Sequence, residues 1–192
     1  MARLRGEPRP LRTAAEAVGF VGGLYALTSL VLALAGAVPL MSAVLPIRPE
    51  NYYFWQTFLA APFVFLGWGA SAGLIHLLGR HGRGRGPFQK TAARAGVAAA
   101  AALFVAWLPM ALAAFFMVVG MRQEELVGLL SSPGPGQVLD FALYVLAAGA
   151  AVVLMTLAAA HGHLKESGRA RAVLLGALAA AVLAGVFAVF IR

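Results

Sequence analysis

The sequence contains no cysteine and few charged residues. The absence of cysteine from all 192 residues excludes disulfides, thiolate-bound metals, iron–sulfur clusters and a cysteine nucleophile. Charged residues make up only 11% of the chain, whereas soluble domains contain about 25%. Among the charged residues, acidic ones are the fewer, with 7 Asp and Glu against 15 Lys and Arg. Hydrophobic residues make up 61% of the chain. This composition is typical of a membrane protein.

Five long apolar runs occupy most of the chain. A bilayer requires about 20 apolar residues per helical span, and backbone groups in hydrocarbon must be paired within the span, so each run is expected to be helical. The sequence therefore predicts an all-α, polytopic bundle of five transmembrane helices in one domain, 18–192, after a basic cytosolic arm, 1–17. The spans are expected at 18–45, 53–78, 95–119, 138–160 and 172–191.

Proline and glycine mark the expected irregularities in these runs. Pro39 is expected to kink or end the first span. Residues 121–137 lie between the third and fourth spans. They contain two adjacent glutamates, then an apolar stretch with three leucines, then a Ser-Ser-Pro-Gly-Pro-Gly turn. This pattern predicts a short amphipathic helix on the membrane surface.

The distribution of Lys and Arg predicts the orientation. With the N-terminus in the cytoplasm and the C-terminus outside, 12 of the 15 positive residues fall on the cytoplasmic side and 3 on the other. Lys and Arg favour cytoplasmic loops. We therefore expect a multi-pass protein of a bacterial inner membrane in this orientation.

The centres of the five spans contain no Asp, Glu, Lys or Arg. Ionisable groups within a membrane usually mark proton relays, ion paths or catalytic centres, so their absence argues against a pump, a proton-coupled carrier or a membrane hydrolase. No enzymatic activity is predicted. The absence of charge does not argue against a path for a neutral solute. The polar lining of such a path would come from Thr28, Gln56, Thr57 and Ser71.

Two pairs of glycines have the spacing of helix-packing motifs. Gly69 and Gly73 flank Ser71 in a G-x-S-x-G pattern, which in hydrolases requires a strand-to-helix turn. Here the pattern lies inside an apolar span, so the glycines are expected to form a small face for close helix packing. Gly19 and Gly23 are interpreted in the same way.

The four histidines include His76 and His161, which end the second and fourth spans. If those helices were neighbours, the two imidazoles could together bind a haem or a surface metal ion. The favoured interpretation is that both are interfacial histidines, without cofactor or metal.

Basic residues cluster next to the expected cytoplasmic ends. The stretch from Arg80 to Arg94 has Phe88 as its only aromatic residue, so nucleic-acid stacking is not predicted. Lys and Arg near a membrane each attract anionic headgroups by about 1 kcal/mol. Lipid or partner contact is predicted for Arg80, Arg83, Arg85, Lys90, Arg94, Lys165, Arg169 and Arg171.

The pattern resembles the Yip-domain family of five-span membrane proteins, whose eukaryotic members are named for Rab-type GTPase partners. The similar stretch contains an aromatic start at 52–56, then Pro62, Trp68, His76 within Leu74–Leu78, Gly86-Pro87-Phe88 and Pro109. The resemblance implies a non-enzymatic, membrane-organising scaffold or accessory subunit that binds a membrane or cytosolic partner and can form a homo-oligomer. No catalytic residue is carried over.

Two alternatives to this function remain. Pro62 and Pro109 are expected to interrupt the second and third spans, and broken helices often build binding sites near the bilayer midplane. That feature favours a small transport subunit for a neutral or apolar solute. The histidine pair supports a weaker alternative, a haem-binding redox subunit.

Overall fold

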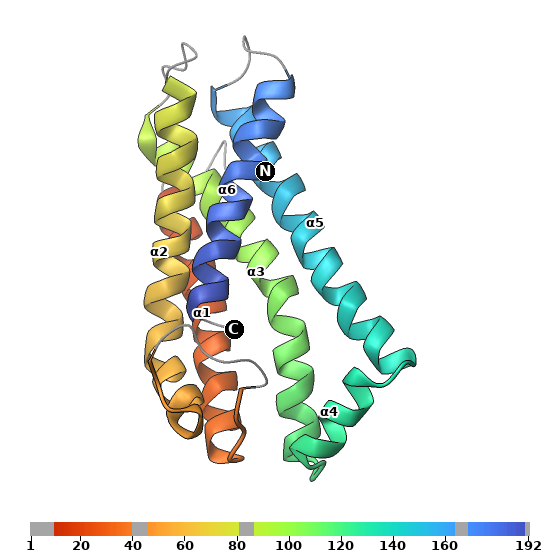
Figure 1. The fold of residues 1–192 in the computed structure, drawn as a ribbon. Helices are drawn as coiled ribbons and strands as arrows, with labels where there is room; N and C mark the ends of the chain where they lie inside the picture. Colours follow the sequence, from red (N-terminus) through yellow and green to blue (C-terminus); the bar gives the residue numbers. More distant parts are fainter. Residues whose placement is uncertain (1–9, 40–45, 81–86, 164–168, 191–192) are drawn as a thin grey trace.

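The computed structural model describes residues 10–39, 46–80, 87–163 and 169–190 (Figure 1). Within these ranges the chain is helical and contains no strand. Five helices are long and apolar enough to cross a membrane, which confirms the expected fold class. The elements are α1 (Pro10–Leu34), η2 (Pro49–Asn51), α2 (Tyr52–Arg80), α3 (Phe88–Val118), α4 (Gln123–Ser131), α5 (Pro135–His163) and α6 (Arg169–Phe190).

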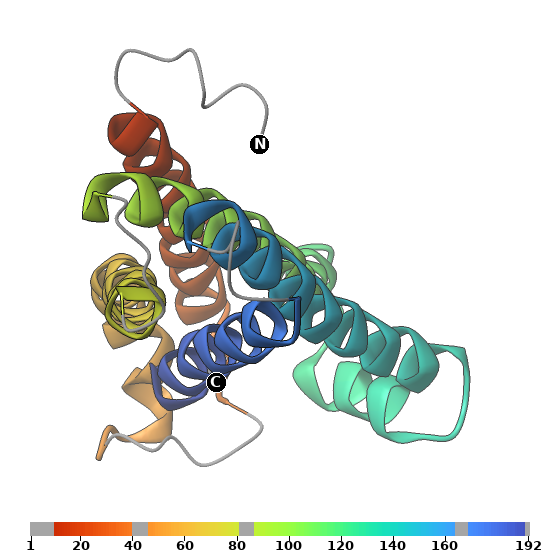
Figure 2. The same cartoon turned by 90° about the horizontal axis from the view of Figure 1, so that it is seen from above.

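The five long helices form a closed ring of neighbours. Helix α1 packs between α2 and α3, α6 packs between α2 and α5, and α5 packs on α3, which completes the ring (Figures 1 and 2). Chain direction alternates, so α1, α3 and α6 begin at the end where α2 and α5 finish. We call this the basic end, because it contains the described side chains of Arg12, Lys90, Arg94 and Arg171. The other end, which contains α4, is called the α4 end.

Small side chains allow the helices to approach closely. Most of the buried hydrophobic residues are alanines, and the main core cluster also contains Val18, Tyr25, Ile75 and Met155. Lipid tails are as apolar as these side chains, so association in a bilayer depends on close packing rather than on burial from water. An alanine-rich interior provides that packing.

The first span ends earlier than expected. Helix α1 stops at Leu34 because Gly36 takes a φ of +70°, a left-handed conformation that glycine adopts without strain. The amides of Ala37 and Gly36 donate to the carbonyls of Leu32 and Ala33, which is a Schellman cap. The expected continuation of this helix past Leu34 is therefore wrong, glycine rather than Pro39 ends it, and residues 40–45 lie outside the described structure. Gly120 ends α3 in the same way, with a φ of +96°.

The first span also begins earlier than expected. Proline is favoured in the first helical turn, and α1 begins at Pro10. Arg12 and Glu16 then lie one turn apart, with Nε and Oε1 separated by 2.7 Å. The first helix therefore begins inside the segment predicted as the basic arm, at Pro10, and residues 1–9 lie outside the described structure.

The two interior prolines do not interrupt their helices. Helix α2 continues through Pro62 and α3 continues through Pro109. The predicted interruption, which was the motive for a midplane site, is therefore wrong. Helix α3 contains 31 residues, a length of about 46 Å at 1.5 Å per residue, so it exceeds the hydrocarbon thickness of about 30 Å.

Different glycines from those expected make the close helix contacts. Of the predicted positions, only Gly19 lies against another helix, where an added Cβ would be 3.6 Å from the Phe65 ring. An added Cβ would meet nothing within 4 Å at Gly23, Gly69 or Gly73 among the residues described, so these do not pack against a neighbouring helix within the chain. The tight contacts are at Gly22 on Ala61, Gly67 on Leu183, Gly96 on Trp68 and Gly176 on Thr156.

The short helix α4 is present where an amphipathic helix was predicted. It is attached to the end of α1 by Gln123, whose side-chain Oε1 accepts the Val38 N–H at 2.9 Å and whose Nε2 donates to the Val38 carbonyl at 2.6 Å. Glu125 accepts the backbone N–H of Arg122, which caps the first turn. Leu126 is buried against the bundle.

Replacing Gln123 by alanine is expected to release the segment after α1. Each hydrogen bond contributes about 0.5–1.5 kcal/mol, so losing both should accelerate hydrogen exchange at the Val38 amide by about tenfold. Hydrogen exchange with mass spectrometry measures this rate. Gln137→Ala, at an exposed position near the start of α5, is the control and should leave the rate unchanged. Equal exchange in both variants would contradict the attachment.

Candidate functional site

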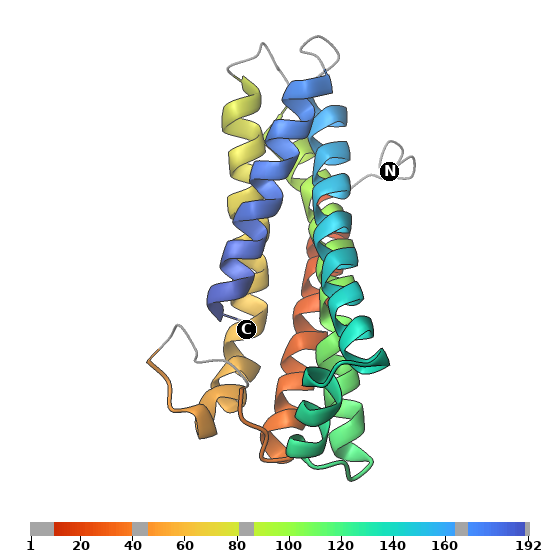
Figure 3. The same ribbon diagram turned by 45° about the vertical axis from the view of Figure 1, so that its right-hand side comes forward.

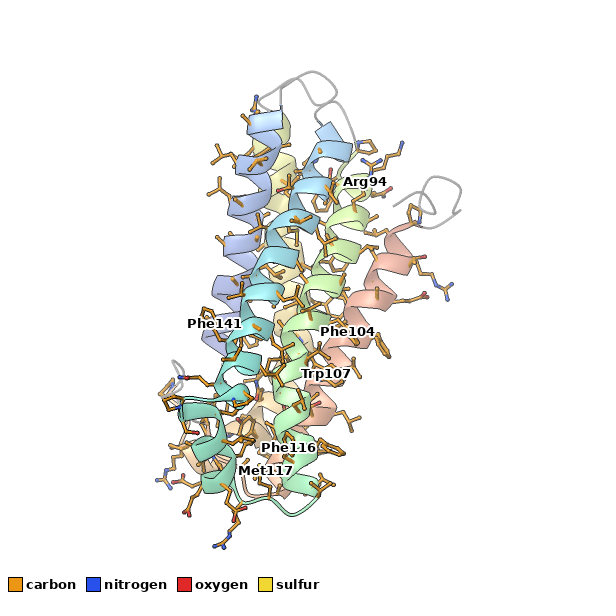
Figure 4. All side chains as sticks on the ribbon, turned by 90° about the vertical axis from the view of Figure 1, so that its right-hand side faces the viewer. Arg94, Phe104, Trp107, Phe116, Met117 and Phe141 are labelled. Carbon is orange, nitrogen blue, oxygen red and sulfur yellow. The ribbon has the colours of Figure 1, made fainter. Side chains whose placement is uncertain are left out.

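The basic end carries positive charge with little acidic compensation. Lys90 is exposed at the start of α3, and Arg94 lies one turn further along, half-buried (Figure 4). Arg171, at the start of α6, donates from Nη2 to the Leu78 carbonyl at 3.0 Å, which supplies a partner for a carbonyl in the last turns of α2. Among the described residues, the only acidic side chain at this end is Glu16, which pairs with Arg12. The surface is therefore suited to anions.

The structure places three of the eight predicted contact residues with their side chains: Lys90, Arg94 and Arg171. Arg80 is the last residue of α2 and Arg169 is the first residue of α6, both at the basic end. Their side chains lie outside the described structure. Arg83, Arg85 and Lys165 lie outside the described residues. The α4 end differs, because its arginines, Arg48 and Arg122, are accompanied by three glutamates, Glu50, Glu124 and Glu125.

The helices that carry His76 and His161, α2 and α5, are not main neighbours in the ring. Helix α2 packs chiefly on α1 and α6, whereas α5 packs on α3 and α6. The ring of His76 lies edge-on to the Phe88 ring, with centroids 5.3 Å apart, and the side chain of His161 lies outside the description. The described residues contain no group of three or more His, Asp or Glu arranged to hold a metal ion.

The hydroxyl groups considered for a polar path are bonded within the bundle. Thr28 accepts a hydrogen bond from Trp107 Nε1 at 2.9 Å. Ser71 donates to the Ala179 carbonyl at 3.0 Å, linking α2 to α6, and Thr57 donates to the Tyr53 carbonyl of its own helix. Three of the four residues therefore join or stabilise helices, while Gln56 is buried with 2% of its surface exposed.

Tyr25 connects several helices at the centre of the bundle. It is completely buried on α1, and its hydroxyl donates to the Leu103 carbonyl of α3 at 3.0 Å. Its ring meets Phe187 of α6 edge-on, with centroids 5.5 Å apart. Tyr144 of α5 lies in the neighbourhood of the Tyr25 hydroxyl. Tyr25 itself therefore contacts two other helices of the bundle, α3 and α6.

The other tyrosines extend this cluster toward the α4 end. Tyr144 also lies in the neighbourhood of Tyr53 on α2, and the rings of Tyr52 and Tyr53 meet edge-on with centroids 5.4 Å apart. All 4 tyrosines of the chain therefore belong to one group, which we call the tyrosine cluster: Tyr25, Tyr52, Tyr53 and Tyr144. The sequence indicated Tyr52 and Tyr53 only as part of the aromatic start at 52–56 and did not single out Tyr25 or Tyr144. The sequence did contain a signal for Tyr25, a tyrosine in the middle of an apolar run. A buried Tyr hydroxyl usually requires a hydrogen-bond partner, so such a residue indicates a polar contact between helices.

Comparison with known proteins identifies no relative, because no family model, curated protein or solved structure matches the chain.

Proposed function

We propose that this multi-pass membrane protein is a non-enzymatic scaffold or accessory subunit of the Yip type, whose basic end binds anionic lipid headgroups or an acidic partner surface. The observation that carries the proposal is the charge separation along the bundle: described basic side chains with one paired glutamate at one end, and arginines balanced by glutamates at the other. The span centres contain no charge. The bias of Lys and Arg supports a cytoplasmic location for the basic end.

Anionic headgroups are the simplest ligands for this surface. Lys90 and Arg94 lie one helical turn apart on α3, so one phosphate can approach both cations. Arginine binds phosphate through a planar fork of donors. Because juxtamembrane charges contribute additively to membrane attraction, the affinity should depend on several residues together.

Neutralising Lys90 and Arg94 as glutamines is expected to weaken phosphatidylglycerol binding by roughly 30-fold, which corresponds to two charges at about 1 kcal/mol each. Native mass spectrometry of the detergent-solubilised protein, titrated with this lipid, measures the change. Arg171 stays unaltered because it also bonds the end of α2.

The matched control removes two positive charges at the α4 end, Arg48→Gln with Arg122→Gln. This variant should retain phosphatidylglycerol at wild-type affinity. An equal loss in both pairs would show that net charge alone attracts the lipid, and no loss in either pair would overturn the proposal.

A further inference from the structure

One face of α3 is accessible along most of the helix. Its side chains recur every three or four positions, a spacing that places them on one side of a helix. Beyond Lys90 and Arg94, toward the α4 end, all of them are apolar and either exposed or half-buried: Val97, Ala101, Phe104, Leu108, Leu112 and Phe115. We call these six residues the α3 stripe. Because α3 packs on both α1 and α5, the stripe lies between these two helices at the surface of the bundle (Figures 3 and 4).

Two cations stand at the head of the α3 stripe. Lys90 is exposed and Arg94 is half-buried, and their spacing from Val97 and Ala101 places them on the same side of α3. Neither of the two ion pairs among the described residues involves Lys90. This side of α3 is therefore cationic at the basic end and apolar beyond it, which is the complement of an anionic phospholipid with its headgroup at the same end.

Short side chains separate these cations from an aromatic pair. Only Val97 and Ala101 lie on the stripe between the cations and Phe104, and Ala101 is exposed. The Phe104 ring lies against the Trp107 ring, with centroids 5.6 Å apart and ring planes inclined by 32° (Figure 4). Trp107 is held in turn by the hydrogen bond that its Nε1 donates to Thr28 at 2.9 Å. An acyl chain can therefore lie close to the α3 backbone beside Ala101 and end against an aromatic surface that is already in place.

The separation of the cations from the aromatic pair matches the depth of one lipid leaflet. Arg94 and Phe104 are 10 positions apart, which is about 15 Å along a helix that rises 1.5 Å per residue. Half of a hydrocarbon core of about 30 Å has the same length. Phe104 also lies next to the midpoint of α3 (Phe88–Val118). A lipid whose phosphate meets Arg94 therefore brings the end of its acyl chain to Phe104.

We propose that the α3 stripe binds one anionic diacyl phospholipid from the leaflet at the basic end, with its phosphate on Lys90 and Arg94 and one acyl chain along Ala101 to Phe104. The inference rests on the proposed function, because it uses the same two cations, and it adds a chain contact that attraction by charge alone does not require. Lipid tails elsewhere in the bilayer are as apolar as this surface, so the preference for the stripe comes from packing against it. The site is consequently saturable and depends on the length of the acyl chain.

Native mass spectrometry of the detergent-solubilised protein, titrated with dipalmitoyl phosphatidylglycerol, tests the chain contact. Phe104→Ala should weaken binding roughly 3- to 10-fold, because the packing of the ring on the chain is lost while both cations remain. Two controls remove other exposed apolar side chains. Phe115→Ala alters the same stripe in the half of α3 nearest the α4 end, and Leu174→Ala alters α6 near the basic end. Both controls should bind the lipid as the wild type does.

A short-chain lipid separates this inference from the headgroup proposal. Dihexanoyl phosphatidylglycerol has the same headgroup, but its chains extend only roughly 6 Å and do not reach Phe104. Phe104→Ala should therefore leave its affinity unchanged, whereas neutralising Lys90 and Arg94 as glutamines should weaken the binding of both lipids.

The outcomes are distinguishable. If the charge variant loses both lipids while Phe104→Ala keeps wild-type affinity for the dipalmitoyl lipid, the chain contact is overturned and the headgroup proposal stands. An equal loss of the dipalmitoyl lipid in Phe104→Ala and Phe115→Ala would also overturn the chain contact, because any exposed ring would then suffice. No loss of either lipid in the charge variant would overturn both proposals.

Discussion

Gly176→Ala is expected to lower the melting temperature of the detergent-solubilised protein by about 6–12 °C. Gly176 of α6 lies directly against Thr156 of α5, and an added Cβ would overlap the backbone nitrogen and Cα of that residue. A backbone cannot rotate out of the way as a side chain can, so α5 and α6 must move apart. Overpacking usually costs about 1–3 kcal/mol, and about 3 kcal/mol produces this shift in a chain of this size.

Gly185→Ala provides a matched control on the same helix. An added Cβ at Gly185 meets nothing within 4 Å among the described residues, and alanine favours helix more than glycine. We expect a melting temperature equal to that of the wild type or slightly higher. A small, equal effect of both substitutions would show that α5 and α6 do not pack through Gly176.

The sequence predicts the number and type of the spans well, because both depend on local composition. A run of about 20 apolar residues must be helical in hydrocarbon, and each of the five expected runs contains a helix in the structure. The positions of the helix ends are harder to predict from the sequence, because each one depends on the conformation of a single turn. Gly36 was a better signal than Pro39, since a glycine that takes a positive φ ends a helix through its own hydrogen bonds.

The contacts between helices were not predictable from spacing alone. Gly69 and Gly73 have the sequence pattern of a packing face, but an added Cβ at either position meets no other helix among the described residues. Gly96 and Gly176, which lack a glycine partner at that spacing, make the close contacts instead. The difference arises from the rotation of each helix about its axis, which the ring of neighbours determines and one span cannot specify.

The tyrosine cluster, like the glycine contacts, depends on how the helices pack and could not be predicted from one span. Tyr25 and Tyr144 are 119 positions apart, and only the packing of α1 and α5 on α3 brings them near each other. Neither residue belongs to a recognisable motif. By contrast, the basic end follows from local clustering of Lys and Arg beside the spans, so its residues could be predicted, although which side of the membrane they face stays a prediction.

Replacing Tyr25 by alanine is expected to destabilise the bundle by about 3 kcal/mol, at the lower end of the range for removal of a large buried aromatic side chain. The value is at this end because lipid or detergent, rather than water, surrounds the unfolded helices, so the transfer term is small and the packing term remains. The lost contacts are the edge-on ring pair with Phe187 and the hydrogen bond to the Leu103 carbonyl.

Two further variants separate these contributions. Tyr25→Phe removes only the hydroxyl, and because the Leu103 carbonyl belongs to a helix, the expected loss is about 1 kcal/mol. Phe20→Ala removes a ring from the same helix at a position where 64% of the surface is exposed, and lipid or detergent replaces the ring there, so the change should be below about 0.5 kcal/mol. Thermal unfolding in one detergent, monitored by circular dichroism, ranks the three.

The ranking decides what Tyr25 does. If Tyr25→Ala is the most destabilising and Tyr25→Phe intermediate, the ring holds α1 to α6 and its hydroxyl holds α1 to α3, as the contacts indicate. If Tyr25→Phe is as damaging as Tyr25→Ala, the hydrogen bond rather than the packing dominates, and the tyrosine cluster stabilises the fold chiefly through its hydroxyl groups. Equal stability of Tyr25→Ala and Phe20→Ala would contradict a central role for this residue, because a site that lipid fills as readily as an exposed one is not packed by protein.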